Sequence, residues 1–142
     1  MNVHAQDIAT NGEATPRGSD WIAPDARGQN FYDIDPGLQD LLKLYLPADV
    51  FAHMEPHFRR LGEIAGGRLD ELAELADKHA PKLHYRDRFG RDQDWIEFHP
   101  AYREMEQIAF GDFGIHAATH KPVLGWHEPL PYLAKYALQY LF

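Results

Sequence analysis

A chain of 142 residues is the size of one domain, and its 44% apolar and 13% aromatic content suffices for one hydrophobic core. The net charge of −8 repels phosphate backbones and does not favour a nucleic-acid interface. The absence of cysteine excludes disulfides, thiolate catalysis and sulfur-ligated zinc. Residues 1–18 lack the features of a secretory signal, and no apolar run could span a bilayer. We therefore expect a soluble, cytoplasmic protein with no membrane partner.

The first 28 residues differ in composition from the rest. They are polar and rich in glycine, proline, threonine and aspartate, and Trp21-Ile22 is their only sizeable apolar pair. Such a segment buries too little apolar surface to offset the entropy lost on ordering. We expect residues 1–28 to form a flexible arm and residues 29–142 to form the ordered domain.

Two amphipathic helices are predicted after the arm. Asp35 followed by Pro36 is typical of a helix start, because aspartate caps free N–H groups and proline suits the first helical position. Apolar residues then recur at helical spacing up to Leu46, and again from Val50 to Ile64 after a stop at Pro47. Pro56 is expected to bend or split the second helix, and Gly66-Gly67 to end it.

In the second half of the chain, the sequence predicts helices before and after one extended segment. A third helix is expected over about 68–79. Residues 83–98 alternate charged and aromatic side chains about a central glycine, which predicts a short hairpin or an extended loop. His99-Pro100 marks another helix start. Ala117 and Ala118 favour helix again before Pro122, and a last helix is expected over about 129–142.

The chain ends on Leu141-Phe142 with no glycine cap, basic last turn or polar tail. We therefore expect that the chain has been cut inside a helix. The alternative is a small protein that buries its apolar end in an oligomer.

Two histidine pairs, His53/His57 and His116/His120, have the i, i+4 spacing that could chelate a divalent metal on one helix face. A site needs at least one more ligand, and the sequence does not indicate which residue would supply it. We therefore assign no metal ligand and keep a small histidine-rich metal protein as the third hypothesis.

No motif for catalysis or cofactor binding is present. There is no Gly-x-Ser-x-Gly element, and the only serine, Ser19, lies in the expected arm. The glycines at 62, 66 and 67 close a predicted helix, whereas a dinucleotide fingerprint would open one after a strand. The residues alone therefore indicate a helical domain without a self-contained active site, and we assign no catalytic or cofactor-binding residue.

Several stretches carry a family resemblance. They are Asn30-Phe31-Tyr32, the run from Leu72 to Ala76, Tyr85-Arg86-Asp87-Arg88-Phe89-Gly90-Arg91, and above all Trp95-Ile96-Glu97-Phe98-His99-Pro100-Ala101-Tyr102. From about residue 30 onward the chain resembles the amino-terminal region of flavin-dependent acyl-CoA dehydrogenases, closest to their adaptive-response (AidB-like) branch.

The resemblance implies an all-α, bundle-like first domain, followed in the family by a β-sheet middle domain and a helical carboxy-terminal domain. In the family, FAD lies between the middle and last domains and against a neighbouring subunit of a homo-oligomer, and the catalytic base comes from the last domain. Acyl-CoA binds to the complete protein. This chain alone is thus expected to hold no FAD. A weak assignment to the wall of the acyl pocket falls on Phe113, Gly114, His116 and Ala117, from their place in the matching helix pair; packing within the domain is the competing role.

The first hypothesis is therefore the first domain of an acyl-CoA dehydrogenase-like flavoprotein, with the middle and carboxy-terminal domains as its partners. The second is a free-standing helical interaction module that docks a partner through its apolar carboxy-terminal helix. On the first hypothesis the isolated polypeptide is expected to self-associate or to be partly molten, because the apolar stripe of the last helix would be uncovered.

Overall fold

The structure, a computed structural model, describes residues 25–142. The elements in chain order are α1 (Pro36–Tyr45), α2 (Ala48–Ile64), the π-helical segment η2 (Ala65–Leu69), α3 (Asp70–Lys78), β1 (Lys82–Arg86), β2 (Asp92–Glu97), α4 (Pro100–Glu106), the π-helical segment η3 (Gln107–Asp112) and α5 (Tyr132–Leu141). The fold is mostly helical, and because it includes one two-stranded antiparallel sheet, the expected all-α class is correct only in part.

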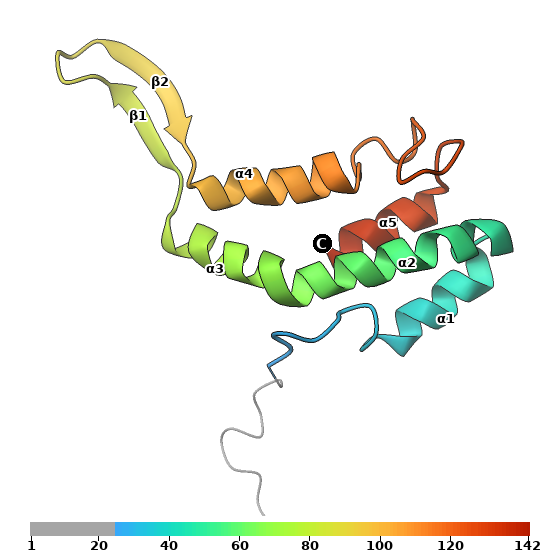
Figure 1. Ribbon diagram of the computed structural model, residues 1–142. Helices are drawn as coiled ribbons and strands as arrows, with labels where there is room; N and C mark the ends of the chain where they lie inside the picture. Colours follow the sequence, from blue (N-terminus) through green and yellow to red (C-terminus); the bar gives the residue numbers. More distant parts are fainter. Residues whose placement is uncertain (1–24) are drawn as a thin grey trace, which may run out of the picture.

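One long helical rod organises the domain (Figure 1). α2, η2 and α3 follow one another along it; α1 and α5 pack against α2, and α4 packs against α3. The hairpin β1–β2 projects beyond the ends of α3 and α4, away from the other helices. Of the expected arm, residues 1–24 lie outside the described residues. No helix within residues 25–142 combines the length and the apolar character that crossing a membrane requires.

The two helix starts predicted from proline-containing pairs are confirmed. Asp35 Oδ1 accepts a hydrogen bond from the Leu38 N–H at 2.9 Å, with Pro36 at the first position of α1. His99 Nδ1 accepts one from the Ala101 N–H at 3.2 Å, and α4 begins at Pro100. In both cases a side chain satisfies an N–H that has no partner inside the helix.

The expectation that Gly66-Gly67 end the second helix is wrong. The residues on both sides of η2 keep right-handed helical angles, so α2 passes through η2 into α3 without a break. The segment before α1 instead lies across this part of the rod: the Gly28 N–H donates to the Gly66 carbonyl oxygen at 2.5 Å, and the Phe31 N–H to that of Gly62 at 3.0 Å. These two glycines permit a close backbone approach.

Pro56 does not split its helix, since α2 is continuous from Ala48 to Ile64 with the proline inside it. Its first turn begins after Pro47, which separates α1 from α2 as predicted.

The hairpin expected within residues 83–98 is confirmed. β1 and β2 pair with Leu83 opposite Ile96 and His84 opposite Trp95, and the register shifts between His84 and Arg86. The reversal uses Gly90, whose φ of +81° lies in the left-handed region that favours glycine.

The carboxy-terminal region differs from the prediction at two points. Residues 115–120 form successive turns in place of a helix, because Gly114 at φ +58° redirects the chain after η3. The last helix begins at Tyr132, later than the expected 129, since Pro131 precedes it as the cap residue. The Leu130 N–H, just before that cap, donates to the Ala118 carbonyl oxygen at 2.7 Å and ties the turns to α5.

The core lies where α1, α2 and α5 meet. Its fully buried side chains come from these helices, from the segment before α1 and from the turns after η3: Tyr32, Leu42, Met54, Phe58, Leu61, Phe113, Ala118, Ala134 and Leu138.

Alanine substitutions at the neighbouring Gly66 and Gly67 should distinguish two effects on stability. One is the close approach of another backbone segment, and the other is the higher helix propensity of alanine. A Cβ at Gly66 would overlap the carbonyl oxygen of Gln29, whereas one at Gly67 would meet no atom within 4 Å. We expect Gly66→Ala to lower the free energy of unfolding by about 1–3 kcal/mol. The matched control Gly67→Ala should raise it by about 0.5–1 kcal/mol, because alanine is the better helix former.

Urea denaturation of the two variants beside the wild type measures both changes. Equal effects of Gly66→Ala and Gly67→Ala would show that residues 28–31 do not approach the rod as described.

Candidate functional site

A row of tyrosines runs along the exposed side of α5. Tyr132, Tyr136 and Tyr140 follow one another at a spacing of four residues and are 63%, 57% and 68% exposed. The opposite side of α5 is buried in the core through Ala134, Ala137, Leu138 and Leu141. A helix that is apolar on both sides is normally covered on both sides.

The carboxy-terminal half of α1 also has exposed apolar side chains. Leu44 and Tyr45 are 72% and 68% exposed, and Leu41 is 43% exposed. Between α1 and α5 lies a shallow pocket of about 340 Å³, lined mainly by Leu38, Leu41, Leu133, Tyr136, Ala137 and Tyr140.

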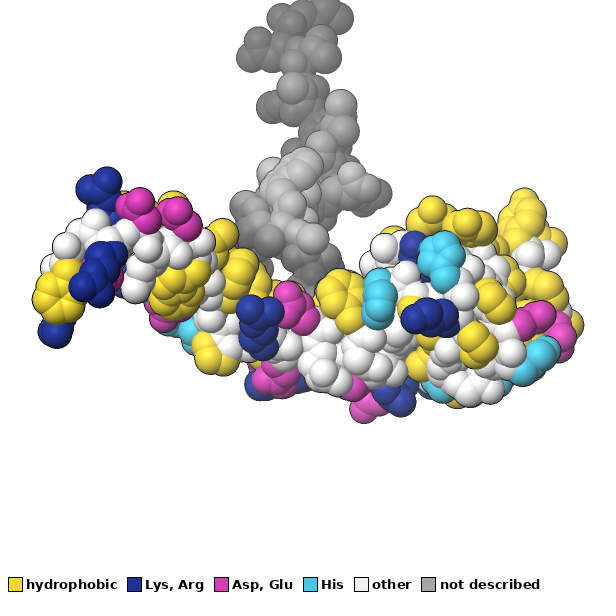
Figure 2. Space-filling model, turned by 90° about the horizontal axis from the view of Figure 1, so that it is seen from above, with side chains coloured by type: hydrophobic (Ala, Val, Ile, Leu, Met, Phe, Trp, Pro, Cys, Tyr) yellow, Lys and Arg dark blue, Asp and Glu magenta, His cyan; other side chains and the backbone are white. Residues whose placement is uncertain are grey.

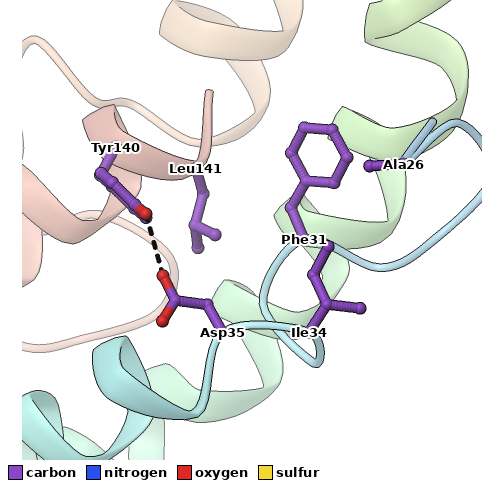
Figure 3. A pocket seen from close by; sticks show the side chains of 6 residues that line it. All are labelled: Ala26, Phe31, Ile34, Asp35, Tyr140 and Leu141. Atoms are coloured by element: carbon purple, nitrogen blue, oxygen red, sulfur yellow. Dashed lines mark hydrogen bonds between the residues drawn. The ribbon is translucent and has the colours of Figure 1, made fainter. Parts of the chain in front are cut away.

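A second pocket, of about 470 Å³, adjoins the first. Figure 3 shows its lining: Ala26, Phe31, Ile34, Asp35, Tyr140 and Leu141. Asp35 and Tyr140 line both pockets, and the two neighbouring pockets are together called the α1/α5 groove.

A hydrogen bond joins the two sides of the α1/α5 groove. The Tyr140 hydroxyl donates to Asp35 Oδ2 at 2.9 Å (Figure 3), while Asp35 Oδ1 caps α1. The hydrogen bond to the carboxylate raises the pKa of Tyr140 above its usual value, since the ionised phenol would face a second negative charge. A carboxylate engaged in capping and a phenol held protonated are suited to positioning and binding rather than to proton transfer.

The four residues assigned to a pocket wall lie elsewhere, in the segment that follows η3. Phe113 is fully buried, with the Arg60 guanidinium 4.5 Å from its ring centroid. Gly114 lies against Val123, and Ala117 is half-buried. His116 is exposed and meets the ring of Phe110 edge-on at 5.3 Å. None of the four lines the α1/α5 groove.

The histidine pairs behave differently from each other. His53 and His57 share one face of α2 with ring centroids 5.4 Å apart, and His53 Nε2 lies 2.9 Å from the Leu124 carbonyl oxygen. His116 and His120 sit in turns, so the expected common helix face is absent for them. Across residues 25–142, no three histidine, aspartate or glutamate side chains come together in a way that could hold a metal.

The pKa of His57 lies below its usual value. Burial is the main cause, because a half-buried imidazolium loses hydration, and the neighbouring His53 and Arg60 add to the effect. The folded protein thus favours neutral His57.

Acidification should therefore destabilise the domain through His57. A histidine whose pKa falls on folding contributes stability that is present above its unfolded pKa of about 6.5 and is lost as pH falls through its folded pKa. Between pH 7.5 and 5, we expect the free energy of unfolding to fall less in His57→Gln than in the wild type. Denaturant titrations at several pH values measure this difference.

The exposed His116→Gln variant is the matched control, and its pH profile should follow that of the wild type. A His57→Gln profile that is parallel to the wild type would contradict the assignment.

Sequence reasoning missed two parts of this region. The tyrosine row was detectable as an i, i+4, i+8 repeat of one residue type at 132, 136 and 140. Trp126, which lies 5.0 Å from the ring of His53, could not be found that way, because it comes from a loop far along the chain.

The chain was compared with protein families and with solved structures. The family model described as the adaptive response protein AidB N-terminal domain matches residues 22–142. A solved chain described as Bd2924 apo-form is similar with a TM-score of 0.71 and 27% sequence identity, over 85% of this chain and 23% of that chain. The present chain thus spans less than a quarter of that structure. No curated protein matches it.

Proposed function

Because the chain belongs to the adaptive response protein AidB N-terminal domain family, we propose that it is the helical first domain of an FAD-dependent acyl-CoA dehydrogenase-like enzyme. In the complete enzyme the reaction would be α,β-dehydrogenation of an acyl-CoA, with the electrons passing to FAD. This domain would not be catalytic by itself. The similar solved chain supports further domains, since the present chain accounts for 23% of its length.

The observation that carries the proposal is the α1/α5 groove, which residues 25–142 leave exposed. Leu41, Tyr136 and Tyr140 line this groove and are exposed, as is Tyr132 in the same row of α5, and an exposed apolar surface of this kind marks a contact surface. The middle and carboxy-terminal domains of the same protein are its proposed cover. The Asp35–Tyr140 hydrogen bond would fix the geometry of this surface, because it joins the start of α1 to the end of α5.

The acyl-pocket role is proposed for the segment after η3. After the turn at Gly114, His116 is exposed beside Phe110, which is itself 52% exposed, and the following Ala117 is half-buried. An exposed aromatic side chain and a small residue in the same region are suited to lie along an acyl chain. In this arrangement Phe113 would support the wall from within the core, and FAD would be held by the later domains.

Three further features are part of the proposal. The protein would be cytoplasmic, would form a homo-oligomer, and would use neither a membrane nor a nucleic acid as a partner of this domain. The alternative function, an interaction module that docks another protein through α5, draws on the same exposed tyrosines.

A substitution in the complete protein tests the proposed function. Purified with its later domains, the protein should carry flavin that acyl-CoA reduces, as followed by the loss of flavin absorbance. Ala117→Leu should lower kcat/KM for long acyl chains by about tenfold, because added side-chain volume in an apolar pocket changes transition-state binding by a factor of that order.

Ala48→Leu, at an exposed position where α2 begins, is the matched control and should leave the acyl-chain profile unchanged. An unchanged profile in Ala117→Leu would contradict the pocket assignment. A complete protein without flavin that binds another protein through α5 would contradict the enzyme and support the interaction module.

A further inference from the structure

The stretch between η3 and α5, residues 113–131, contains no helix or strand and is called the connecting segment below. Four of its apolar residues are buried in the core: Phe113, Ile115, Ala118 and Leu130. Residues 119–129 lie outside the core, and none of them is buried. The backbone hydrogen bonds of the segment run within it or to the neighbouring ends of η3 and α5. Its outer part therefore needs another attachment to keep a fixed position on the helical rod.

The polar side chains of the connecting segment face mostly outward. Five of them are exposed: His116, His120, Lys121, His127 and Glu128. Seen from above, histidine side chains gather on the surface at the end of the molecule opposite the hairpin, where this segment lies (Figure 2). The attachment is therefore to be sought in side chains of another element.

His53 on α2 makes such a contact. Its Nε2–H donates to the Leu124 carbonyl oxygen at 2.9 Å. The centroids of the His53 and Trp126 rings lie 5.0 Å apart, and a Cβ at Gly125 would lie 3.9 Å from His53 Cε1. The same carbonyl also faces His57, one turn further along α2. Three consecutive residues of the connecting segment thus lie around one imidazole.

The hydrogen bond from His53 holds a turn that is unfavourable for its own sequence. Leu124 has a φ of +53°, and Gly125 has one of +78°. The Trp126 N–H closes the turn by donating to the Val123 carbonyl oxygen at 3.0 Å. A positive φ is easy for glycine and strained for leucine, so such a backbone persists only where surrounding contacts hold it. His53 provides one of these contacts, at the carbonyl of the strained residue itself.

The turn at residues 123–126 also contacts the proposed wall of the acyl pocket. Val123 packs against Gly114, since a Cβ at Gly114 would lie 2.8 Å from Val123 Cγ1. Gly114 is one of the four residues assigned to the wall, and the half-buried Ala117 follows it. A chain of contacts therefore runs from His53 through the turn to Gly114.

We propose that His53 is a positioning residue for the acyl pocket: it holds the turn at 123–126 on α2, and the turn holds Gly114 and the wall that follows. The inference rests on the proposed function and adds a residue that influences acyl-chain preference without touching the substrate. A wall that moves would lose contacts that long acyl chains make and short ones do not. The effect should appear in KM for long chains more than in kcat, because the catalytic base would come from the last domain.

Amide hydrogen exchange of the full 142-residue chain tests the attachment without flavin. His53→Phe keeps an aromatic ring beside Trp126 and removes the donor. We expect exchange at the Trp126 and Leu130 amides to become about three- to tenfold faster, as for the loss of one hydrogen bond. His53→Gln should restore the wild-type rates, because its side-chain amide can donate to the same carbonyl.

His79→Phe is the matched control. His79 Nδ1 lies 2.8 Å from the Leu75 carbonyl oxygen of α3, so the variant also removes a histidine contact to a carbonyl, but far from the connecting segment. It should leave exchange at Trp126 and Leu130 unchanged. Exchange in α1 of the same samples should match the wild type in every variant, which excludes a general loss of structure.

Acyl-chain preference in the complete protein gives the second readout. His53→Phe should lower the ratio of kcat/KM for long over short acyl-CoA by about threefold, mainly through KM, and His53→Gln should restore it. Unchanged exchange in His53→Phe, or no restoration by His53→Gln, would show that the hydrogen bond does not hold the turn. If Ala117→Leu changes the acyl-chain ratio and His53→Phe does not, the positioning role fails alone; if neither changes it, the proposed pocket fails as well.

Discussion

The carbonyl oxygens of Gly62 and Gly66 fix the position of residues 28–31, the segment before α1. The α1/α5 groove depends on that position. The two oxygens accept hydrogen bonds from the Phe31 and Gly28 N–H groups, which brings the segment backbone-to-backbone onto the rod. A Cβ at Gly62 would lie 2.5 Å from the Tyr32 nitrogen, so the approach depends on glycine. From this anchor the chain reaches Asp35, which both caps α1 and accepts the Tyr140 hydrogen bond.

The domain presents two apolar surfaces of different character. The α1/α5 groove is concave and rich in tyrosine, and it lies directly over the core helices. Leu83, Tyr85 and Ile96 are exposed on the projecting two-stranded sheet, which is separate from the groove.

Short sequence patterns predicted the structure correctly where interactions between residues close in sequence determine it. The pairs Asp35-Pro36 and His99-Pro100 predicted helix starts, and the alternation about Gly90 predicted the hairpin. The predictions were wrong where a contact between residues far apart in the sequence determines the local structure. A glycine pair resembles a helix end, but Gly66 serves the approach of residues 28–31 and leaves the helix intact. The helix propensity of Ala117 and Ala118 likewise predicted a helix, whereas the chain forms turns there after Gly114.

Hydroxyl-radical labelling of tyrosine side chains tests the central claim most directly, namely that the α1/α5 groove is the surface on which the later domains of the same protein pack. The isolated chain and the complete flavin-bound protein would be labelled side by side. The account predicts strong protection of Tyr132, Tyr136 and Tyr140 in the complete protein, with no change at Phe89, which is 69% exposed at the hairpin tip. Equal labelling of the three tyrosines in both samples would contradict it.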